Sequence, residues 1–167
     1  MSKRIVLGID PGYGRMGWGV ISMQNGAATY VDAGCIETNS KESGPARLAT
    51  IASELRRLLT THQPHIIGME NLLFSKNVTT GIRVGEARGV ALLVCQEFNL
   101  PVEELSPSAI KLAAAGHGQA TKAMVGKMIA AQLHLKKLPR PDDAVDALAI
   151  ALCASTSYVP LRRNHHA

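Results

Sequence analysis

Hydrophobic residues follow two periodicities along the chain, and their order predicts a mixed α/β fold. Short apolar runs bounded by turn residues predict five strands, at 5–9, 17–23, 28–36, 65–69 and 101–105. Apolar residues spaced three and four positions apart predict helices at 45–61, 78–98, 108–115, 121–133 and 142–155. The predicted fold class is therefore α/β, with a five-stranded mixed sheet flanked by helices.

The order of these elements indicates which strand ends meet. The first three strands form an antiparallel meander, with Asn25-Gly26 as the hairpin turn, while the first, fourth and fifth lie parallel through helical crossovers. Sites in such sheets form at the carboxyl ends of the parallel strands. Asp10 ends the first strand and Glu70 ends the fourth. We therefore expect these two carboxylates at one edge of the sheet.

Two further acids, Asp143 and Asp146, begin the last predicted helix. Three residues apart, they project from one helix face, and the apolar segment 147–152 after them indicates a helix packed inside the domain. Two carboxylates there repel each other unless a cation lies between them, and hard oxygen ligands favour Mg²⁺ or Mn²⁺. Asp142, after Pro139-Arg140-Pro141, is interpreted as the helix cap instead.

Each acid alone has an ordinary structural explanation. Asp10 before Pro-Gly could simply start a turn, and Glu70 could be a solvated residue at a strand end. The four acids together are typical of a ligand set for two cations about 3.5–4 Å apart that act on a phosphodiester.

Composition narrows the class of partner. The 167 residues include 18 Lys and Arg against 13 Asp and Glu, and the net charge of +5 favours nucleic acid over an anionic membrane. Three scattered cysteines, at 35, 95 and 153, suggest reduced thiols and no zinc site. No apolar run is long enough for a membrane span, so we expect a cytoplasmic protein. Residues 1–157 are expected to form one domain, followed by a disordered basic tail at 158–167.

Several motifs resemble the signatures of the RuvC-type Holliday junction resolvases. They are Gly8-Ile-Asp-Pro-Gly12 with Gly17-Trp-Gly19, the Glu70 segment through Lys76-Asn77, Gly85-Glu-Ala-Arg-Gly89, and Asp143-Ala-Val-Asp-Ala-Leu-Ala149. The resemblance covers nearly the whole chain. It implies a ribonuclease H-like fold and a homodimer that resolves four-way junctions by paired symmetric nicks in DNA recombination and repair. It also implies two Mg²⁺ ions per active site, replaceable by Mn²⁺, and a branch-migration complex as a further partner.

The same resemblance assigns roles to the four acids. Asp10, Glu70, Asp143 and Asp146 correspond to the catalytic, metal-binding acids of the family. Some members have His where this chain has Asp143.

The resemblance also marks candidate DNA-binding residues. An apolar side chain in the loop after Glu70, either Leu73 or Phe74, is the candidate wedge against unstacked bases. Both side chains could instead pack against the hydrophobic core. Lys76 and Arg83 would extend a basic track, with Arg88 beside them.

Two lysines match basic positions that the family uses near the scissile phosphate. They are Lys111 and Lys122, which could otherwise be ordinary solvated lysines. The polar loop between them, 116–119, suits backbone contacts with phosphate.

Glycines recur every four residues in the long helix, at Gly81, Gly85 and Gly89. Each costs about 1 kcal/mol relative to Ala in a helix interior, so close packing of a second helix should offset them. That helix could be the first helix of this chain or the same helix of a second subunit.

Two other functions compete with the nuclease. The Gly-Ile-Asp-Pro-Gly start also resembles the phosphate loop of actin-like sugar and acetate kinases, which need a second domain that this chain is too short to hold. A non-catalytic protein that binds branched DNA could share the fold, but it would be expected to lack one or more of the four acids.

Overall fold

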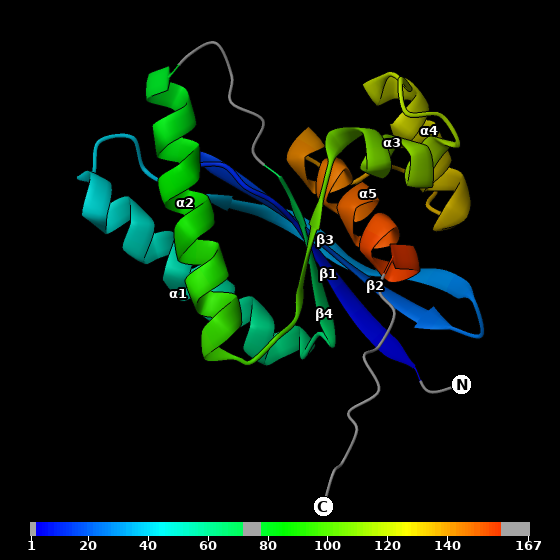
Figure 1. Ribbon diagram of the computed structural model, residues 1–167, viewed down its shortest axis with the longest axis horizontal. Helices are drawn as coiled ribbons and strands as arrows, with labels where there is room; N and C mark the ends of the chain where they lie inside the picture. Colours follow the sequence, from blue (N-terminus) through cyan, green and yellow to red (C-terminus); the bar gives the residue numbers. More distant parts are fainter. Residues whose placement is uncertain (1–2, 72–77, 158–167) are drawn as a thin grey trace, which may run out of the picture.

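The computed structural model describes residues 3–71 and 78–157 and contains one five-stranded sheet (Figure 1). The strands are β1 (Arg4–Asp10), β2 (Arg15–Gln24), β3 (Ala27–Glu37), β4 (Ile66–Glu70) and β5 (Val102–Leu105). The helices are α1 (Gly44–His62), α2 (Val78–Glu97), α3 (Pro107–Ala115), α4 (Lys122–Gln132) and α5 (Asp142–Ser157). The spatial order is β3-β2-β1-β4-β5, with β1 parallel to β4 and β4 parallel to β5. The predicted mixed α/β sheet is therefore confirmed.

Helices cover both faces of the sheet (Figure 1). α1 and α2 lie on one face, over a core of large aliphatic side chains such as Leu55, Leu58 and Ile67. α5 crosses the other face, with α3 and α4 outside it. Because side chains alternate along a strand, Leu7 and Ile9 belong to the first core, and Asp10 faces the α5 side.

α5 lies directly on the sheet because three adjacent strands present glycine to it. Gly8 pairs with Gly19 of β2 and with Gly68 of β4, which makes a row of three glycines across the sheet. A Cβ at Gly8 would lie 2.0 Å from the carbonyl oxygen of Ala147 in α5. The sheet therefore contributes no side chain along this glycine row, and α5 approaches it with its backbone at Gly8 and with both backbone and side-chain atoms at Gly19 and Gly68.

The glycines of α2 have the opposite surroundings. A Cβ at Gly81 or Gly89 would have no heavy atom within 4 Å outside its own local backbone. α2 packs inward through other residues, which include Ala87, Ala91 and Val94. The interpretation that α1 of this chain covers the glycine face is therefore wrong at Gly81 and Gly89.

Local capping fixes where the helices of the α5 face begin. The side chain of Thr121 accepts a hydrogen bond from the backbone N–H of Met124, so α4 starts at Lys122. Ser106 caps α3 in the same way, ahead of Pro107. Within residues 3–71 and 78–157, no helix has the length and hydropathy needed to cross a membrane.

Candidate active site

Three carboxylates from three elements line one cavity at the carboxyl edge of the sheet. Asp10 comes from the end of β1, Glu70 from the end of β4, and Asp146 from the second turn of α5. Lys111 of α3 and Lys122 of α4 line the same cavity, whose volume is about 220 Å³. Five of the six residues predicted for the reaction centre thus meet at one place.

The glycine row explains why these carboxylates meet. Asp10 stands two residues after Gly8, and Glu70 two residues after Gly68, so both side chains project from the face on which α5 lies. Direct contact between α5 and this face brings Asp146 to the same edge. The site is therefore a consequence of helix-to-sheet distance as well as of strand order.

The carboxylates destabilise one another's charged forms. Burial, followed by the charges of Asp146, Glu70 and Asp143, raises the pKa of Asp10 from 3.8 to about 7. Burial and the charge of Asp146 also raise the pKa of Glu70. The carboxylates of the site thus carry more negative charge than its two lysines neutralise, which is typical of a site that binds divalent cations.

The two lysines lower this repulsion in part. Nζ of Lys122 donates a hydrogen bond of 2.7 Å to Oδ2 of Asp146, and this bond raises the pKa of Lys122. Lys122 and Lys111 both act to lower the pKa of Glu70. Each lysine therefore acts electrostatically on a carboxylate of the cavity, although the Lys122 side chain is also 78% exposed.

Asp143 lies beside the cavity but does not line it. Its Oδ2 is 3.4 Å from a terminal nitrogen of Arg15, and this oxygen is buried without a hydrogen-bond partner. Its charge still contributes to the raised pKa of Asp10. The predicted set of four acids is therefore brought to one region, with Asp143 turned toward the start of β2.

The donor atoms suit hard divalent cations, although they do not surround one point. Among the described residues, no three His, Cys, Asp or Glu side chains are grouped closely enough to hold one ion. Asp143 is engaged by Arg15, and Asp146 by Lys122. A buried carboxylate oxygen without a hydrogen bond, next to an acid whose pKa is about 7, is the environment that a cation would stabilise. Carboxylate oxygens favour Mg²⁺ or Mn²⁺ over softer metals.

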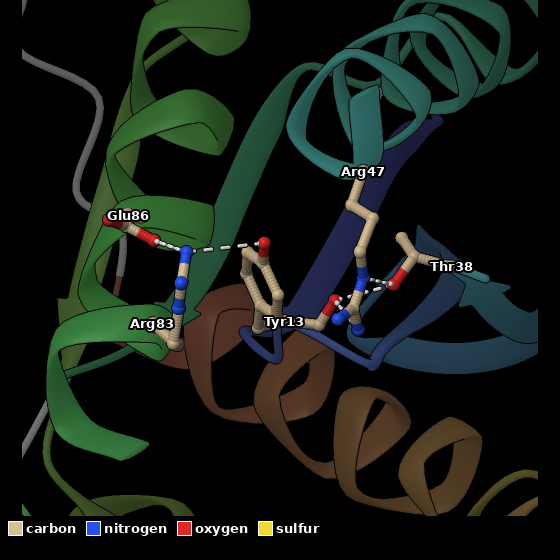
Figure 2. Close-up of polar contacts among 5 residues, drawn as sticks. All are labelled: Tyr13, Thr38, Arg47, Arg83 and Glu86. Atoms are coloured by element: carbon tan, nitrogen blue, oxygen red, sulfur yellow. Dashed lines mark hydrogen bonds and ion pairs between the residues drawn. The ribbon is translucent and has the colours of Figure 1, made fainter. Parts of the chain in front are cut away.

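The turn after Asp10 is held by both helices of the opposite face (Figure 2). The guanidinium of Arg47, from α1, lies 4.1 Å from the centre of the Tyr13 ring. Arg47 also donates to Thr38 Oγ1 at 2.9 Å and to the Tyr13 carbonyl at 3.4 Å. Tyr13 and Arg47 were not predicted as site residues, because nothing in their local pattern indicates this contact across 34 residues.

Arg83 reaches the same tyrosine from α2 (Figure 2). Its Nη1 lies 3.4 Å from the Tyr13 hydroxyl and 3.2 Å from Oε2 of Glu86. About half of the Arg83 side chain remains exposed. The residue therefore stands near the turn that carries Asp10 and keeps a surface for another partner.

Arg88 serves a different purpose from the one suggested by its charge. Its Nη2 contacts a carboxylate oxygen of Glu104 on β5 and lies 3.5 Å from Oδ1 of Asn71. Only 16% of its side chain is exposed. The prediction of a basic track that includes Arg88 is wrong, since this arginine ties α2 to the strand ends around Glu70.

Some predicted residues fall outside the part of the chain that the structure describes. They are Leu73, Phe74 and Lys76 in the loop after Glu70, together with the tail at 158–167.

Comparisons with known proteins identify close relatives over almost the full length. The family model "Crossover junction endodeoxyribonuclease RuvC" matches residues 6–154. A protein of that name from Petrotoga mobilis is 45% identical over 149 residues, which cover 89% of this chain and 91% of the relative. Another, from Roseiflexus sp. strain RS-1, is 41% identical over 163 residues, covering 98% and 97%. The structure of T. thermophilus RuvC in complex with Holliday junction substrate matches with a TM-score of 0.87 at 33% identity, covering 91% and 93%.

Proposed function

The chain belongs to the RuvC family of crossover junction endodeoxyribonucleases and is an endonuclease that resolves Holliday junctions, and we propose that Asp10, Glu70, Asp143 and Asp146 are its catalytic, metal-binding residues. The observation that carries this assignment is the cavity in which three of these acids meet Lys111 and Lys122. Asp143 joins the set through its charge on Asp10.

Divalent cations held by these carboxylates, two Mg²⁺ or in their place Mn²⁺, would activate a water and stabilise the leaving oxygen at the phosphodiester. Glu70 and Asp146 both line the cavity and would bind from the β4 and α5 sides. Burial and three neighbouring carboxylates raise the pKa of Asp10 to about 7 when no cation is bound. Cation binding and the ionisation of Asp10 are thus coupled.

The lysines orient the substrate phosphate in this proposal. Lys111 and Lys122 bring two positive charges to the rim of a cavity that otherwise repels DNA. With a cation bound at Asp146, Nζ of Lys122 would be free to donate to a phosphate oxygen. Negative charge that develops on the phosphate during cleavage would strengthen the contacts of Lys111 and Lys122 with it.

The DNA path is proposed to continue from this cavity along the loop after Glu70 to the start of α2. Leu73 or Phe74 would wedge against unstacked bases at the branch point, with Lys76 and Arg83 on the backbone. The half-exposed guanidinium of Arg83, beside the Asp10 turn, supports its part in this path.

A homodimer is proposed to place two such sites on one junction. The surface of α2 has open space at Gly81 and Gly89 and exposes three large apolar side chains, Val78, Ile82 and Leu93, between 59% and 71%. Small residues flanked by exposed aliphatic ones suit the close approach of an identical helix about a two-fold axis. We further propose a cytoplasmic location and a branch-migration complex as partner, from family membership alone.

One experiment tests the function directly. Synthetic four-way junction, fork and linear duplex would be incubated side by side with Mg²⁺, Mn²⁺ or chelator. We expect paired symmetric nicks in the four-way junction only when a cation is present. Tight binding without cleavage under all conditions would instead favour the non-catalytic branched-DNA-binding protein.

A further inference from the structure

A second hollow lies beside the active site, at the start of α5. It has a volume of about 550 Å³ and is lined by Arg15, Arg140, Pro141 and Asp142. Arg15 begins β2, directly after the turn that follows Asp10, and Arg140 precedes α5. Two guanidinium groups from distant parts of the sequence thus face one open space next to Asp143, and none of the roles described above uses them.

The charges in this region cancel while no cation is bound at Asp143. The terminal nitrogen of Arg15 lies 3.4 Å from Oδ2 of Asp143, and Arg140 has Asp142 beside it in the hollow. Two positive and two negative charges leave no net attraction for an anion. A cation bound by Asp143 would neutralise that carboxylate and leave the hollow with an excess of positive charge.

The contact between Arg15 and Asp143 is suited to exchange. The Arg15 side chain is 57% exposed, and its contact with Asp143 is an ion pair without hydrogen-bond geometry. Only the arginine end of this pair is exposed, because Oδ2 of Asp143 is buried and has no hydrogen-bond partner. A divalent cation bound at this oxygen would replace a 3.4 Å contact that has no hydrogen bond, and the planar guanidinium released by it is well shaped for a phosphate.

We propose that Arg15 and Arg140 form a binding site for a backbone phosphate of the DNA, and that Arg15 becomes available to it when a divalent cation takes over Asp143. The proposal rests on the assignment of Asp143 as a metal ligand. It makes Arg15 a link between the two ligands, since the same side chain competes with the cation and then binds the substrate. DNA and cation should consequently each increase the affinity of the other.

The test uses the full chain and two glutamine variants, Arg15→Gln and Arg140→Gln. Arg57→Gln is the matched control, because Arg57 pairs with Glu54 on α1 and is 60% exposed, much like Arg15. Mn²⁺ affinity without DNA is measured by calorimetry. Junction affinity is measured against salt concentration in chelator and in Ca²⁺, a hard cation for the same oxygen ligands, with the junction checked to be intact. Thermal unfolding confirms that each variant folds.

Arg15→Gln should tighten Mn²⁺ binding by up to about fivefold, because a competing cation is removed. Arg140→Gln and Arg57→Gln should leave Mn²⁺ affinity unchanged. Both Arg15→Gln and Arg140→Gln should weaken junction binding in Ca²⁺ and flatten the salt slope by up to about one unit, while Arg57→Gln should not. The loss for Arg15→Gln should shrink in chelator, where Arg15 is held by Asp143.

Wild-type Mn²⁺ affinity in Arg15→Gln, or junction binding in both variants equal to that of Arg57→Gln, would overturn the proposal. Failure of the active-site assignment has a different signature. In that case Glu70→Gln would bind Mn²⁺ as the wild type does, whatever the arginine variants do.

Discussion

The two faces of the sheet carry helices in different ways. On the α5 face, the helix lies directly on the strand backbones, because Gly8, Gly19 and Gly68 place no side chain of the sheet in between. On the α1 and α2 face, large aliphatic side chains fill the space, among them Leu55 and Met69. Both arrangements bury apolar surface, but only the first fixes the distance between helix and sheet.

This difference matters because the candidate active site spans one of these contacts. Asp146 belongs to α5, and Asp10 and Glu70 belong to the sheet. A shift of α5 would separate them, whereas a small shift of α1 would be absorbed by the repacking of side chains. The α5 face thus combines stability with the geometry of the site, and the other face contributes mainly stability.

The largest expected effect comes from filling the glycine row. Gly8→Ala places a Cβ 2.0 Å from the Ala147 carbonyl oxygen, so α5 must move. We expect loss of several kcal/mol of stability and loss of cleavage in the molecules that remain folded. Chemical unfolding and single-turnover cleavage of a four-way junction measure the two effects.

The matched change on the other face is Ile51→Ala, at a fully buried residue of α1. It should cost about 2–5 kcal/mol, while the cleavage rate of the folded fraction stays near that of the wild type. Equal losses of cleavage in both variants would remove the distinction between the two faces.

Removal of one carboxylate should affect activity rather than folding. Glu70→Gln keeps the shape of the side chain but removes a charge from the cavity, so nicking in Mg²⁺ should be abolished. Junction binding should persist or tighten, because less negative charge faces the phosphates. Gel-based cleavage and binding assays test this, and near-normal turnover would withdraw Glu70 from the catalytic set.

Asp10 should make the metal-free protein sensitive to pH. Its pKa rises from 3.8 to about 7, so between these values the folded protein binds the proton more tightly than the unfolded chain does. Stability should accordingly fall as pH rises through this window. In chelator at pH 8, Asp10→Asn should be more stable than the wild type by up to roughly 4 kcal/mol.

Thermal unfolding at pH 5 and pH 8 measures the effect, which should fall to less than half at pH 5 and vanish only below the unfolded pKa of 3.8. Added Mg²⁺ should stabilise the wild type more than Asp10→Asn. If Asp10→Asn is no more stable than the wild type at pH 8, burial and repulsion do not destabilise the charged form of Asp10.

The lysines of the cavity should have smaller effects that depend on salt. Lys111→Ala and Lys122→Ala should each flatten the slope of log affinity against log salt by up to about one unit. The nicking rate at saturating protein should fall further than occupancy explains, because a contact to the reacting phosphate is lost. Unchanged slopes and rates would mean that both residues are solvated lysines.

The smallest effect on folding is expected at the glycines of α2. Gly81→Leu meets open space, so the stability of the single subunit should change by no more than about 1 kcal/mol. The same change should abolish the proposed dimer, because close helix approach is blocked. Sedimentation of the variant measures this, and an intact dimer would place the subunit interface elsewhere.

Much of the molecule was predictable from the sequence alone. The periodicity identified the five strands and five helices, because side-chain direction repeats every two or 3.6 residues. Strand order and the rule of carboxyl ends placed Asp10 and Glu70 at one edge, and the spacing of Asp143 and Asp146 put both on the first turns of one helix. These features depend on local chemistry or on chain connectivity, so the sequence determined them.

Only the tertiary structure decided which partner each charged side chain has. Asp143 turns to Arg15, Arg88 to Glu104, and the Asp10 turn is held through Tyr13 by two helices. The function of the strand glycines also became visible only when α5 lay on them. A periodic pattern states which face a residue occupies but not which distant residue it meets. That choice depends on distances of a few ångströms between segments far apart in the chain, and packing alone sets them.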